Sequence, residues 1–577
     1  MSAALPGKGL PQAWAGQPQW RVLEIGFGVG LNFLATWHAW RSDPLRPRLL
    51  HFCSMDASAV AADELLRAAA EHPELQPLAQ ALEAQWEGLV PGFHRLVFEN
   101  GRVLLTLCVG DVPGLLREQS FRADAVFLDG LARSCDPHMA EPRTLKAVTR
   151  LARRGATLAA STLAAAVQRE LQACGWQLEP VPERGGLAGR YAPAWEPRGQ
   201  PDLPAMKPAE CIVIGAGLAG AAAAASLARR GWSVQVIDGA MSPATGASGL
   251  PAGLLAPHQS PDDNLLSRLS RAGVRITLQQ AARLAAGIEW ERTGTLESRG
   301  DDVRPLPPVG EALQPWTREA TEAQKRAAGI DVAQSAWWHA NAAWIEPAAL
   351  VRLWLREQGV RFHGGRSVAR IRPVETGWLV EDATNTTIAS APLVVVAAAL
   401  GSAALFDDGA LPLHPVRGQL TWAPHGEDAA SLPSFPVNGN GHFLPRVPLV
   451  ERGAWITGSS YGRNDADSDW RPADDLDNLQ RVQERMPRAA EVMQAAMARG
   501  ETRSWSGVRC ASADRRPLVG EVAPGLWVST AMGSRGLTFA ALCGELIAAR
   551  LHGEPLPLEA RLAQALDVSR RVRPRSG

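Results

Sequence analysis

The sequence lacks the features that mark several classes of protein. Its seven cysteines are scattered without a C-x-x-C pair, which argues against a disulfide framework and a structural zinc site. No apolar run reaches the roughly 18 residues of a membrane span, and the N-terminus has no signal-peptide pattern. We therefore expect a cytoplasmic protein with no membrane partner.

Charge and histidine spacing bear on two further classes of site. The 59 basic and 59 acidic residues leave a formal net charge of zero, so only a local basic patch could give an electrostatic argument for a nucleic-acid partner. The twelve histidines show no ligand spacing, and we expect no metal site. The twenty tryptophans could stack on RNA bases, but packing explains most of them more simply. At 577 residues, the chain predicts two or three domains.

A glycine-rich turn after an apolar run is the strongest signal in the chain. Residues 211–220 spell C-I-V-I-G-A-G-L-A-G, a predicted strand that enters G-x-G-x-x-G and then a helix. Gly215 permits the tight turn, Gly217 lets backbone N–H groups approach a pyrophosphate, and Gly220 lets helix and strand pack closely. The next predicted strand ends at Asp238, where a carboxylate can accept hydrogen bonds from ribose hydroxyls. The pattern predicts a dinucleotide site.

A second glycine-rich turn lies near the N-terminus. Residues 21–25 predict a strand with Glu24 near its end, and Gly26, Gly28 and Gly30 lead into a helix. This E-x-G-x-G-x-G form resembles motif I of the S-adenosylmethionine methyltransferases. There the glycines let the backbone lie against the methionine part of the cofactor.

Acidic residues recur where later strands of this first region end. Asp56, Asp111 and Asp129 each follow a predicted strand. Each alone is compatible with an ordinary turn or N-cap aspartate. Together with Glu24 they predict a cofactor site, because ligands bind at the carboxyl ends of strands in open α/β sheets. We expect Asp56 to bind ribose hydroxyls.

A proline-rich stretch divides the chain. Seven prolines occur from Pro180 to Pro208, which indicates an extended connection between domains. We therefore predict a first domain over residues 1–190, a linker over 191–208 and a second domain over 209–577.

Two further segments of the second domain suit a flavin. One is rich in small residues and lets backbone pass close to a flat ring, and the other opens a helix whose N-terminus suits the electron-rich end of a reduced flavin. The residues added to the predicted cofactor site are Gly246, Ala247, Ser248, Gly533, Ser534, Arg535 and Gly536.

These motifs carry a family resemblance. G-A-G-L-A-G, G-A-S-G, V-R-G-Q, G-V-R-C-A-S-A-D-R-R-P-L-V-G and G-S-R-G-L resemble the FAD-dependent D-amino-acid-oxidase and glycine-oxidase superfamily. L-E-I-G-F-G-V-G-L-N-F-L and F-L-D-G resemble a methyltransferase fused ahead of such an oxidase in the bifunctional tRNA 5-methylaminomethyl-2-thiouridine biosynthesis (MnmC) family.

The resemblance implies a fold of α/β and α+β class. The N-terminal part is expected to form a Rossmann-like methyltransferase sheet. The C-terminal part is expected to form a Rossmann-type FAD-binding domain with an inserted antiparallel-sheet substrate domain.

The resemblance also implies two reactions on the wobble uridine of tRNA, with FAD and S-adenosyl-L-methionine as cofactors. The oxidase removes the carboxymethyl group of 5-carboxymethylaminomethyl-2-thiouridine, and the methyltransferase methylates the resulting amine. Arg509 matches the superfamily position that holds a substrate carboxylate, and Asp129 is placed to orient the amine and accept its proton. Arg417 and Arg515 are weaker candidates for the carboxylate. No obligate protein partner is evident.

The first part of the sequence departs from the family in two places. The family usually has more chain before the first strand, and Leu5–Leu10 resembles the segment just ahead of it, so we expect the first domain to lack upstream residues in this sequence. Leu131–Ala140 keeps only part of the family pattern and lacks its tryptophan. This keeps open an amine or amino-acid oxidase with a degenerate methyltransferase domain, and an RNA-binding module with a vestigial flavin fold.

Overall fold

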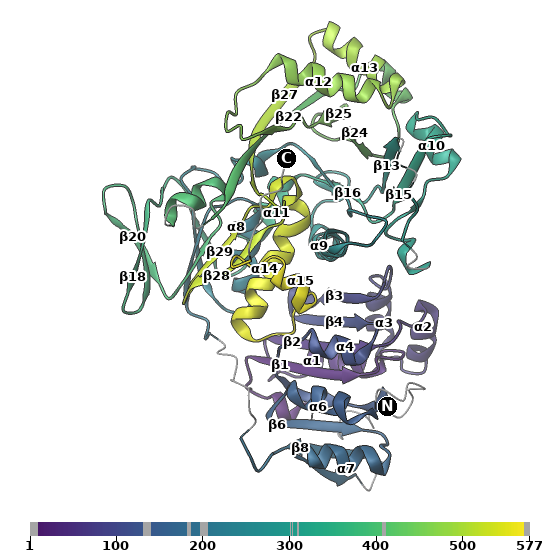
Figure 1. Cartoon of the computed structure of the whole chain (residues 1–577), viewed down its shortest axis with the longest axis vertical. Helices are drawn as coiled ribbons and strands as arrows, with labels where there is room; N and C mark the ends of the chain where they lie inside the picture. Colours follow the sequence, from purple (N-terminus) through teal and green to yellow (C-terminus); the bar gives the residue numbers. More distant parts are fainter. Residues whose placement is uncertain are drawn as a thin grey trace. The chain divides into compact units, whose positions relative to one another are not determined.

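The computed structural model describes residues 10–130, 140–181, 186–196, 206–300, 302, 304–307, 311–406 and 411–570 (Figure 1). The chain forms two compact units, one of Met1–Lys207 with Ala548–Ala563 and the other of Pro208–Ile547 with Gln564–Gly577. The predicted domain boundaries at 190 and 208 stay a prediction. Residues 5–9, 131–139 and 197–205, to which the sequence analysis gave a meaning, lie outside the described residues.

The first unit is built on an eight-stranded sheet in the order β3-β4-β2-β1-β5-β6-β8-β7. The five central strands β4, β2, β1, β5 and β6 are parallel, while β3, β7 and β8 are antiparallel to their neighbours. The strands are β1 (Gln19–Ile25), β2 (Leu49–Asp56), β3 (Gly92–Phe98), β4 (Val103–Val109), β5 (Ala123–Phe127), β6 (Ala152–Ala160), β7 (Trp176–Pro180) and β8 (Leu187–Tyr191). Its helices include α1 (Leu31–Ser42), α2 (Ala62–Ala70), α3 (Gln76–Glu83), α4 (Val112–Arg117), α6 (Pro142–Arg150) and α7 (Ala165–Ala173). The strand order reverses between β1 and β5, which is where open α/β sheets bind ligands.

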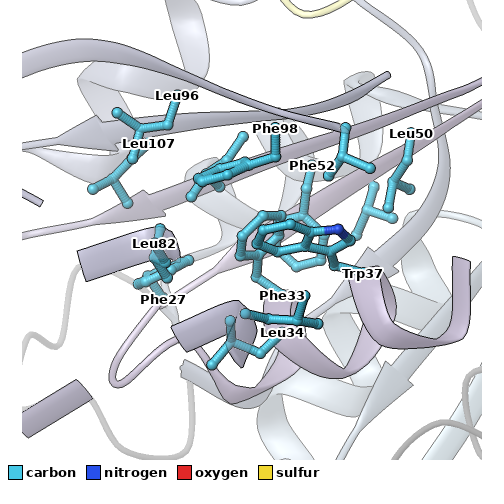
Figure 2. Close-up of a cluster of buried hydrophobic side chains, with 14 of the residues drawn as sticks. Phe27, Phe33, Leu34, Trp37, Leu50, Phe52, Leu82, Leu96, Phe98 and Leu107 are labelled. Atoms are coloured by element: carbon cyan, nitrogen blue, oxygen red, sulfur yellow. The ribbon is translucent and has the colours of Figure 1, made fainter. Parts of the chain in front are cut away.

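Aromatic side chains hold α1 against this sheet. Phe33 and Trp37, one turn apart on α1, pack with ring centroids 5.6 Å apart. Phe52 of β2 lies 5.3 Å from Phe33, and Phe98 of β3 lies 4.5 Å from Trp37 (Figure 2). All four rings are buried. Because α1 follows the glycine turn directly, this packing also fixes where the turn ends.

Residues from the C-terminal part of the chain complete the first unit. Gln119 donates from Nε2 to the Leu556 carbonyl at 3.3 Å and accepts from the Leu556 N–H at 2.9 Å. Arg95 of β3, also buried, donates to the Pro555 carbonyl at 2.5 Å. The segment Ala548–Ala563 therefore satisfies buried polar groups of a unit to which it is distant in sequence.

The second unit contains two large sheets. A six-stranded sheet has the order β17-β10-β9-β21-β29-β28 and is parallel except for β28. A nine-stranded, mainly antiparallel sheet has the order β14-β15-β13-β23-β24-β25-β22-β26, with β27 paired to β22. This second sheet is inserted between β10 and β28 in the chain, as the predicted fold class requires.

The strands of the two large sheets are β9 (Glu210–Ile214), β10 (Ser233–Ile237), β13 (Thr295–Gly300), β14 (Arg318–Glu319), β15 (Ser335–His339), β17 (Val360–His363), β21 (Leu393–Val396), β22 (Leu413–Pro424), β23 (Val437–Gly439), β24 (Gly441–Val447), β25 (Ala454–Gly458), β26 (Gly462–Arg463), β27 (Arg503–Ser512), β28 (Leu518–Ala523) and β29 (Leu526–Thr530). Two three-stranded sheets hold β11 (Gly253–Leu255), β12 (Trp290–Glu291), β16 (Ala343–Ile345), β18 (Arg370–Val374), β19 (Gly377–Glu381) and β20 (Thr387–Ala391). The longer helices are α8 (Leu218–Arg229), α9 (Leu265–Ala281), α10 (Glu322–Ala328), α11 (Pro347–Leu355), α12 (Pro472–Gln483), α13 (Pro487–Ala498) and α14 (Gly536–His552). No helix in the described part of the chain is long and apolar enough to span a membrane.

The contact between Gln119 and Leu556 generates a first prediction. Gln119→Leu leaves the buried N–H and C=O of Leu556 without partners, at a cost of about 1–3 kcal/mol for each group. We expect faster hydrogen exchange in peptides covering Ala548–Ala563, measured by mass spectrometry. Gln168→Leu removes a comparable side-chain bond to the Leu163 carbonyl elsewhere in the unit and is the matched control. Equal exchange of this segment in the two variants would contradict the prediction.

Candidate active sites

The glycine turn between β9 and α8 is sterically required. Gly215 has φ +105°, and a Cβ there would lie 2.5 Å from the Ala397 carbonyl oxygen. A Cβ on Gly220 would collide with the Gly215 carbonyl oxygen. A side chain at either position would displace backbone, so the turn stays open for a ligand only with glycine.

Polar side chains brace this turn. Asp238, which follows β10, accepts hydrogen bonds from the N–H groups of Ala216 at 2.7 Å and Ala240 at 2.8 Å. Ser248 Oγ accepts from the N–H of Leu218 at 3.0 Å, at the start of α8. A Cβ on Gly217 would approach Ser248 Oγ to 3.1 Å. Asp238 and Ser248 therefore hold the turn and the start of α8 through hydrogen bonds.

A cavity of about 1070 Å³ joins the predicted residues of the second unit. The predicted residues that line it are Gly215, Gly217, Asp238, Gly246, Ala247, Ser248, Arg509, Gly533, Ser534, Arg535 and Gly536. Gly220 is not among the lining residues and acts beneath the turn. The glycine-lined cavity fits FAD. Asp238 is the predicted contact of its ribose, and Gly533–Gly536 are the predicted contacts of its flavin end.

Arg509 is the candidate that binds a substrate carboxylate. It lies on β27, and its Nη2 donates to Ser459 Oγ at 2.9 Å and the Ser460 carbonyl at 3.1 Å. Its guanidinium carbon lies 5.4 Å from the ring centroid of Tyr461. Burial lowers the pKa of Arg509. The side chain is fixed at the cavity wall with its charge in a poorly solvated place.

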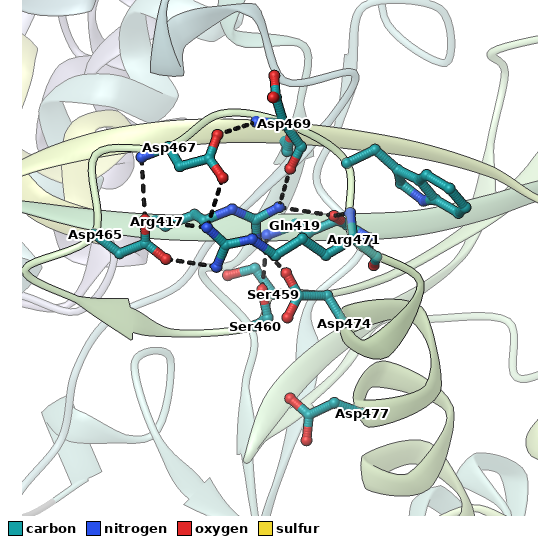
Figure 3. Close-up of polar contacts among 12 residues, drawn as sticks. Arg417, Gln419, Ser459, Ser460, Asp465, Asp467, Asp469, Arg471, Asp474 and Asp477 are labelled. Carbon is teal, nitrogen blue, oxygen red and sulfur yellow. Dashed lines mark hydrogen bonds and ion pairs between the residues drawn. The ribbon is translucent and has the colours of Figure 1, made fainter.

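The structure places the weaker arginine candidates elsewhere. Arg417 is buried and pairs with Asp474, and it donates to Gln419 at 3.0 Å (Figure 3). Neither Arg417 nor Arg515 lines the cavity. Arg535 does line it, and burial lowers its pKa.

Two cavity histidines escaped the sequence analysis. Burial, with Arg509 and Arg485 nearby, lowers the pKa of His442 from 6.5 to about 4. Its Nε2 is buried and has no hydrogen-bond partner. Burial, with Arg535 nearby, also lowers the pKa of His258. The N-G-N-G stretch just before His442 is typical of a hairpin turn and could have pointed to this residue, since the turn places the imidazole at the start of β24.

The methyltransferase site starts from a comparable turn. Gly26, Gly28 and Gly30 all have positive φ, at +85°, +53° and +75°. A Cβ on Gly26 would collide with Gly130, whereas one on Gly28 would meet open space. Asp56, at the end of β2, accepts a hydrogen bond from the N–H of Gly28 at 3.0 Å.

Asn32 links the two acidic residues on either side of this turn. Its Nδ2 donates to Glu24 Oε1 at 2.8 Å and to Asp129 Oδ2 at 3.0 Å. The second Asp129 oxygen accepts from the Ser161 N–H at 2.6 Å. Ser54 Oγ donates to the second Glu24 oxygen at 2.7 Å. Asn32 lay inside the recognised motif, but its sequence position alone did not reveal this link.

A smaller cleft of about 200 Å³ lies at this turn. Its described lining residues are Gly26, Phe27, Gly28, Val29, Leu31, Asn32, Asp56, Ala57, Asp129 and Gly130. Glu24, Gly30 and Asp111 do not line it: Glu24 is buried below, Gly30 caps α1, and Asp111 caps α4 through the Gly114 N–H at 2.8 Å. Their roles toward S-adenosylmethionine stay predictions. The backbone-lined cleft with Asp56 at its edge fits that cofactor.

Fold and sites thus define a Rossmann-type flavoprotein fused to a Rossmann-like methyltransferase. The family described as FAD dependent oxidoreductase matches residues 210–550, and the S-adenosyl-L-methionine-dependent methyltransferase family matches residues 73–190.

Relatives with both units in one chain are closely similar. The chain is 51% identical to the tRNA 5-methylaminomethyl-2-thiouridine biosynthesis bifunctional protein MnmC of Polaromonas naphthalenivorans (strain CJ2) over 97% of this chain and 92% of that protein. It is 52% identical, with the same coverage, to the protein of that name from Polaromonas sp. (strain JS666). The chain belongs to the MnmC family of bifunctional tRNA-modification proteins, which confirms the resemblance.

The solved glycine oxidase from Bacillus cereus ATCC 14579 matches with a TM-score of 0.51. At 20% identity, over 63% of this chain and 99% of that one, this likeness shows the fold of the oxidoreductase unit.

The depressed pKa of His442 generates a prediction of acid sensitivity. The unfolded chain takes up a proton at His442 below about pH 6.5, whereas the native ring does so only near pH 4. Stability therefore falls as the pH is lowered through this window, because the unfolded state binds up to about one more proton than the native state. We expect His442→Gln to weaken this acid dependence. The measurement is the change in the urea midpoint of unfolding between pH 7 and pH 4.

His414→Gln, on strand β22 of the same sheet and outside the lining residues, is the matched control. An unchanged pH dependence in His442→Gln would contradict the prediction. His258 acts in the same direction, so some acid dependence will remain in the variant.

Proposed function

We propose that this chain modifies the wobble uridine of tRNA in two steps. The oxidoreductase unit removes the carboxymethyl group of 5-carboxymethylaminomethyl-2-thiouridine, and the methyltransferase unit then methylates the aminomethyl product. The observation that carries the proposal is Arg509, a half-buried arginine that Ser459 and Ser460 hold at the wall of the cavity that the predicted FAD residues also line. The names of the relatives supply the substrate.

The arm of this uridine is in effect an N-substituted glycine. Arg509 binds its carboxylate through the two-pronged geometry that guanidinium groups favour. FAD held at Gly215, Gly217 and Asp238 would supply the acceptor for a hydride from the α-carbon, and hydrolysis of the substrate imine would release glyoxylate and leave the primary amine.

The positive charges of Arg509 and Arg535 disfavour a protonated amine in the same cavity. Burial, with Arg509 and Arg485 nearby, likewise lowers the pKa of His442. The substrate is therefore held with its nitrogen lone pair free.

The methyltransferase unit must present a neutral amine to the cofactor. S-adenosylmethionine supplies the methyl group, and Asp129 orients the amine and accepts its proton. Asn32 and the Ser161 N–H hold one Asp129 oxygen each, so the carboxylate has a fixed direction. Asn32 also separates the charge of Asp129 from that of Glu24.

Nucleoside analysis tests the whole proposal. Modified tRNA is incubated with the flavin-loaded protein, with and without S-adenosylmethionine. We expect the aminomethyl nucleoside without it and the methylaminomethyl nucleoside with it. An amine oxidase with a degenerate methyltransferase unit would stop at the aminomethyl form in both cases.

Arg509→Lys is expected to impair the oxidase step alone. Replacing the two-pronged contact with a point charge should cost about 2–3 kcal/mol, or roughly 30- to 150-fold in kcat/KM for glyoxylate release. Flavin absorbance should be unchanged. Arg463→Lys, an exposed position on β26, is the matched control. Wild-type kcat/KM in Arg509→Lys would remove this residue from the site.

Asp129→Asn is expected to impair methyl transfer alone. The amide keeps the shape but neither carries charge nor accepts the proton, so the methylation rate should fall about 10²- to 10⁴-fold. The aminomethyl nucleoside should accumulate while glyoxylate release keeps its normal rate. Asp63→Asn on the exposed face of α2 is the control. Normal methylation in Asp129→Asn would show that another group receives the proton.

A further inference from the structure

A pair of glycines lines one wall of the oxidase cavity. Gly418 of β22 and Gly507 of β27 face each other in register, and both line the cavity. The Arg509 guanidinium lies against Gly418, where any Cβ would collide with it. The Trp505 ring lies against Gly507, where a Cβ would come within 2.5 Å of it. The two bare positions let a cation and an indole lie flat along the same wall.

Strand geometry puts Trp505 and Arg509 on the same side of β27. Side chains alternate along a strand, so positions 505, 507 and 509 share one face. At about 3.3 Å per residue, Gly507 lies about 7 Å along the strand from Arg509. The indole that covers Gly507 therefore lies beside the guanidinium that covers the paired Gly418.

Tyr461 supplies a second aromatic ring beside the same cation. It lines the cavity, its ring is 5.4 Å from Arg509, and the residue is 43% exposed. The other tyrosine of the chain, Tyr191, is buried in the first unit. An exposed aromatic residue on a cavity wall leaves a flat apolar face available to a ligand.

A backbone hydrogen bond before Tyr461 and two ion pairs after it hold the chain on both sides of this residue. Before it, the Ser460 N–H donates to the Gln419 carbonyl at 3.2 Å. After it, Arg471 closes the loop by binding Asp465 at 2.6 Å and Asp467 at 2.7 Å (Figure 3). The backbone on either side of Tyr461 is therefore held before any ligand arrives, which lowers the cost of ordering this segment on binding.

The length of the substrate arm sets where the base must lie. Four covalent bonds of about 1.5 Å join the carboxylate carbon to the uracil ring, an extended reach of about 5 Å. With the carboxylate on Arg509, the base must lie beside this arginine in the cavity, starting about 5 Å beyond the carboxylate carbon. Tyr461 and Trp505 are the aromatic lining residues that meet this condition.

We propose that Tyr461 and Trp505 form a base-binding subsite, which stacks on the wobble uracil while Arg509 holds the carboxylate of its arm. The inference rests on the proposed function and adds how the oxidase selects a nucleoside over a free amino acid. Stacking on aromatic rings recognises any flat base, so the arm carries the chemical specificity and the rings carry affinity.

The alternative is that Trp505 only packs against its neighbours. It borders a hydrophobic cluster that includes Leu420 and Ile456, as does Trp422, which does not line the cavity. Trp422→Ala is therefore the matched control, because it removes an indole from the same cluster without touching the cavity.

The test compares KM and kcat for glyoxylate release from tRNA bearing the carboxymethylaminomethyl arm. We expect Tyr461→Ala and Trp505→Ala each to raise KM by about 10-fold, with a smaller effect on kcat and full flavin content. Tyr461→Phe keeps the ring and should restore the wild-type KM. Trp422→Ala should stay within about twofold of wild type.

Three outcomes overturn the subsite. They are a KM within about twofold of wild type in both alanine variants, no recovery in Tyr461→Phe, and an equal rise in Trp422→Ala. The proposed function fails in a different way, because the wild-type protein then releases no glyoxylate from the modified tRNA, and the subsite falls with it.

Discussion

Both units depend on one interaction, in which an aspartate after the second strand binds the glycine turn after the first. Asp56 accepts the Gly28 N–H at 3.0 Å, and Asp238 accepts the Ala216 N–H at 2.7 Å. A hydrogen bond to a charged group contributes about 1.5–3 kcal/mol. It also holds an otherwise permissive glycine turn in one shape, so that the backbone is ready for a cofactor. Either turn would lose this shape without its carboxylate.

The turns and their acids could be predicted because the signals are local. Strand, turn and helix follow one another within about 20 residues, and each glycine has a steric reason. The contacts of Asn32, His442 and Tyr461 could not be predicted in this way. Asn32 reaches Asp129 only because β1 and β5 are neighbours, and the cavity around Arg509 exists only through the pairing of β22 with β27. Such pairing joins residues about 90 positions apart, and no local pattern encodes it.

The two arginines on these paired strands show how register decides function. Arg417 faces Val508 in the pairing, and Arg509 faces Val416. Because side chains alternate along strands, one residue of offset sends Arg417 and Arg509 to opposite faces of the sheet. Arg417 meets Asp474 and is neutralised, while Arg509 meets Gly418 and the cavity. The sequence ranked Arg509 above Arg417 through the family resemblance, and the alternation of side chains along the strands gives the physical reason for this difference.

The charges of the two sites also order the two reactions. The oxidase cavity presents Arg509 and Arg535, which suit an arm that still carries its carboxylate. The methyltransferase cleft presents Asp56 and Asp129, and none of its described lining residues is basic. An arm with a carboxylate is repelled there, whereas the primary amine left after oxidation is attracted. Loss of the carboxylate thus removes the group that Arg509 binds, and the charges of the two sites favour oxidation before methylation.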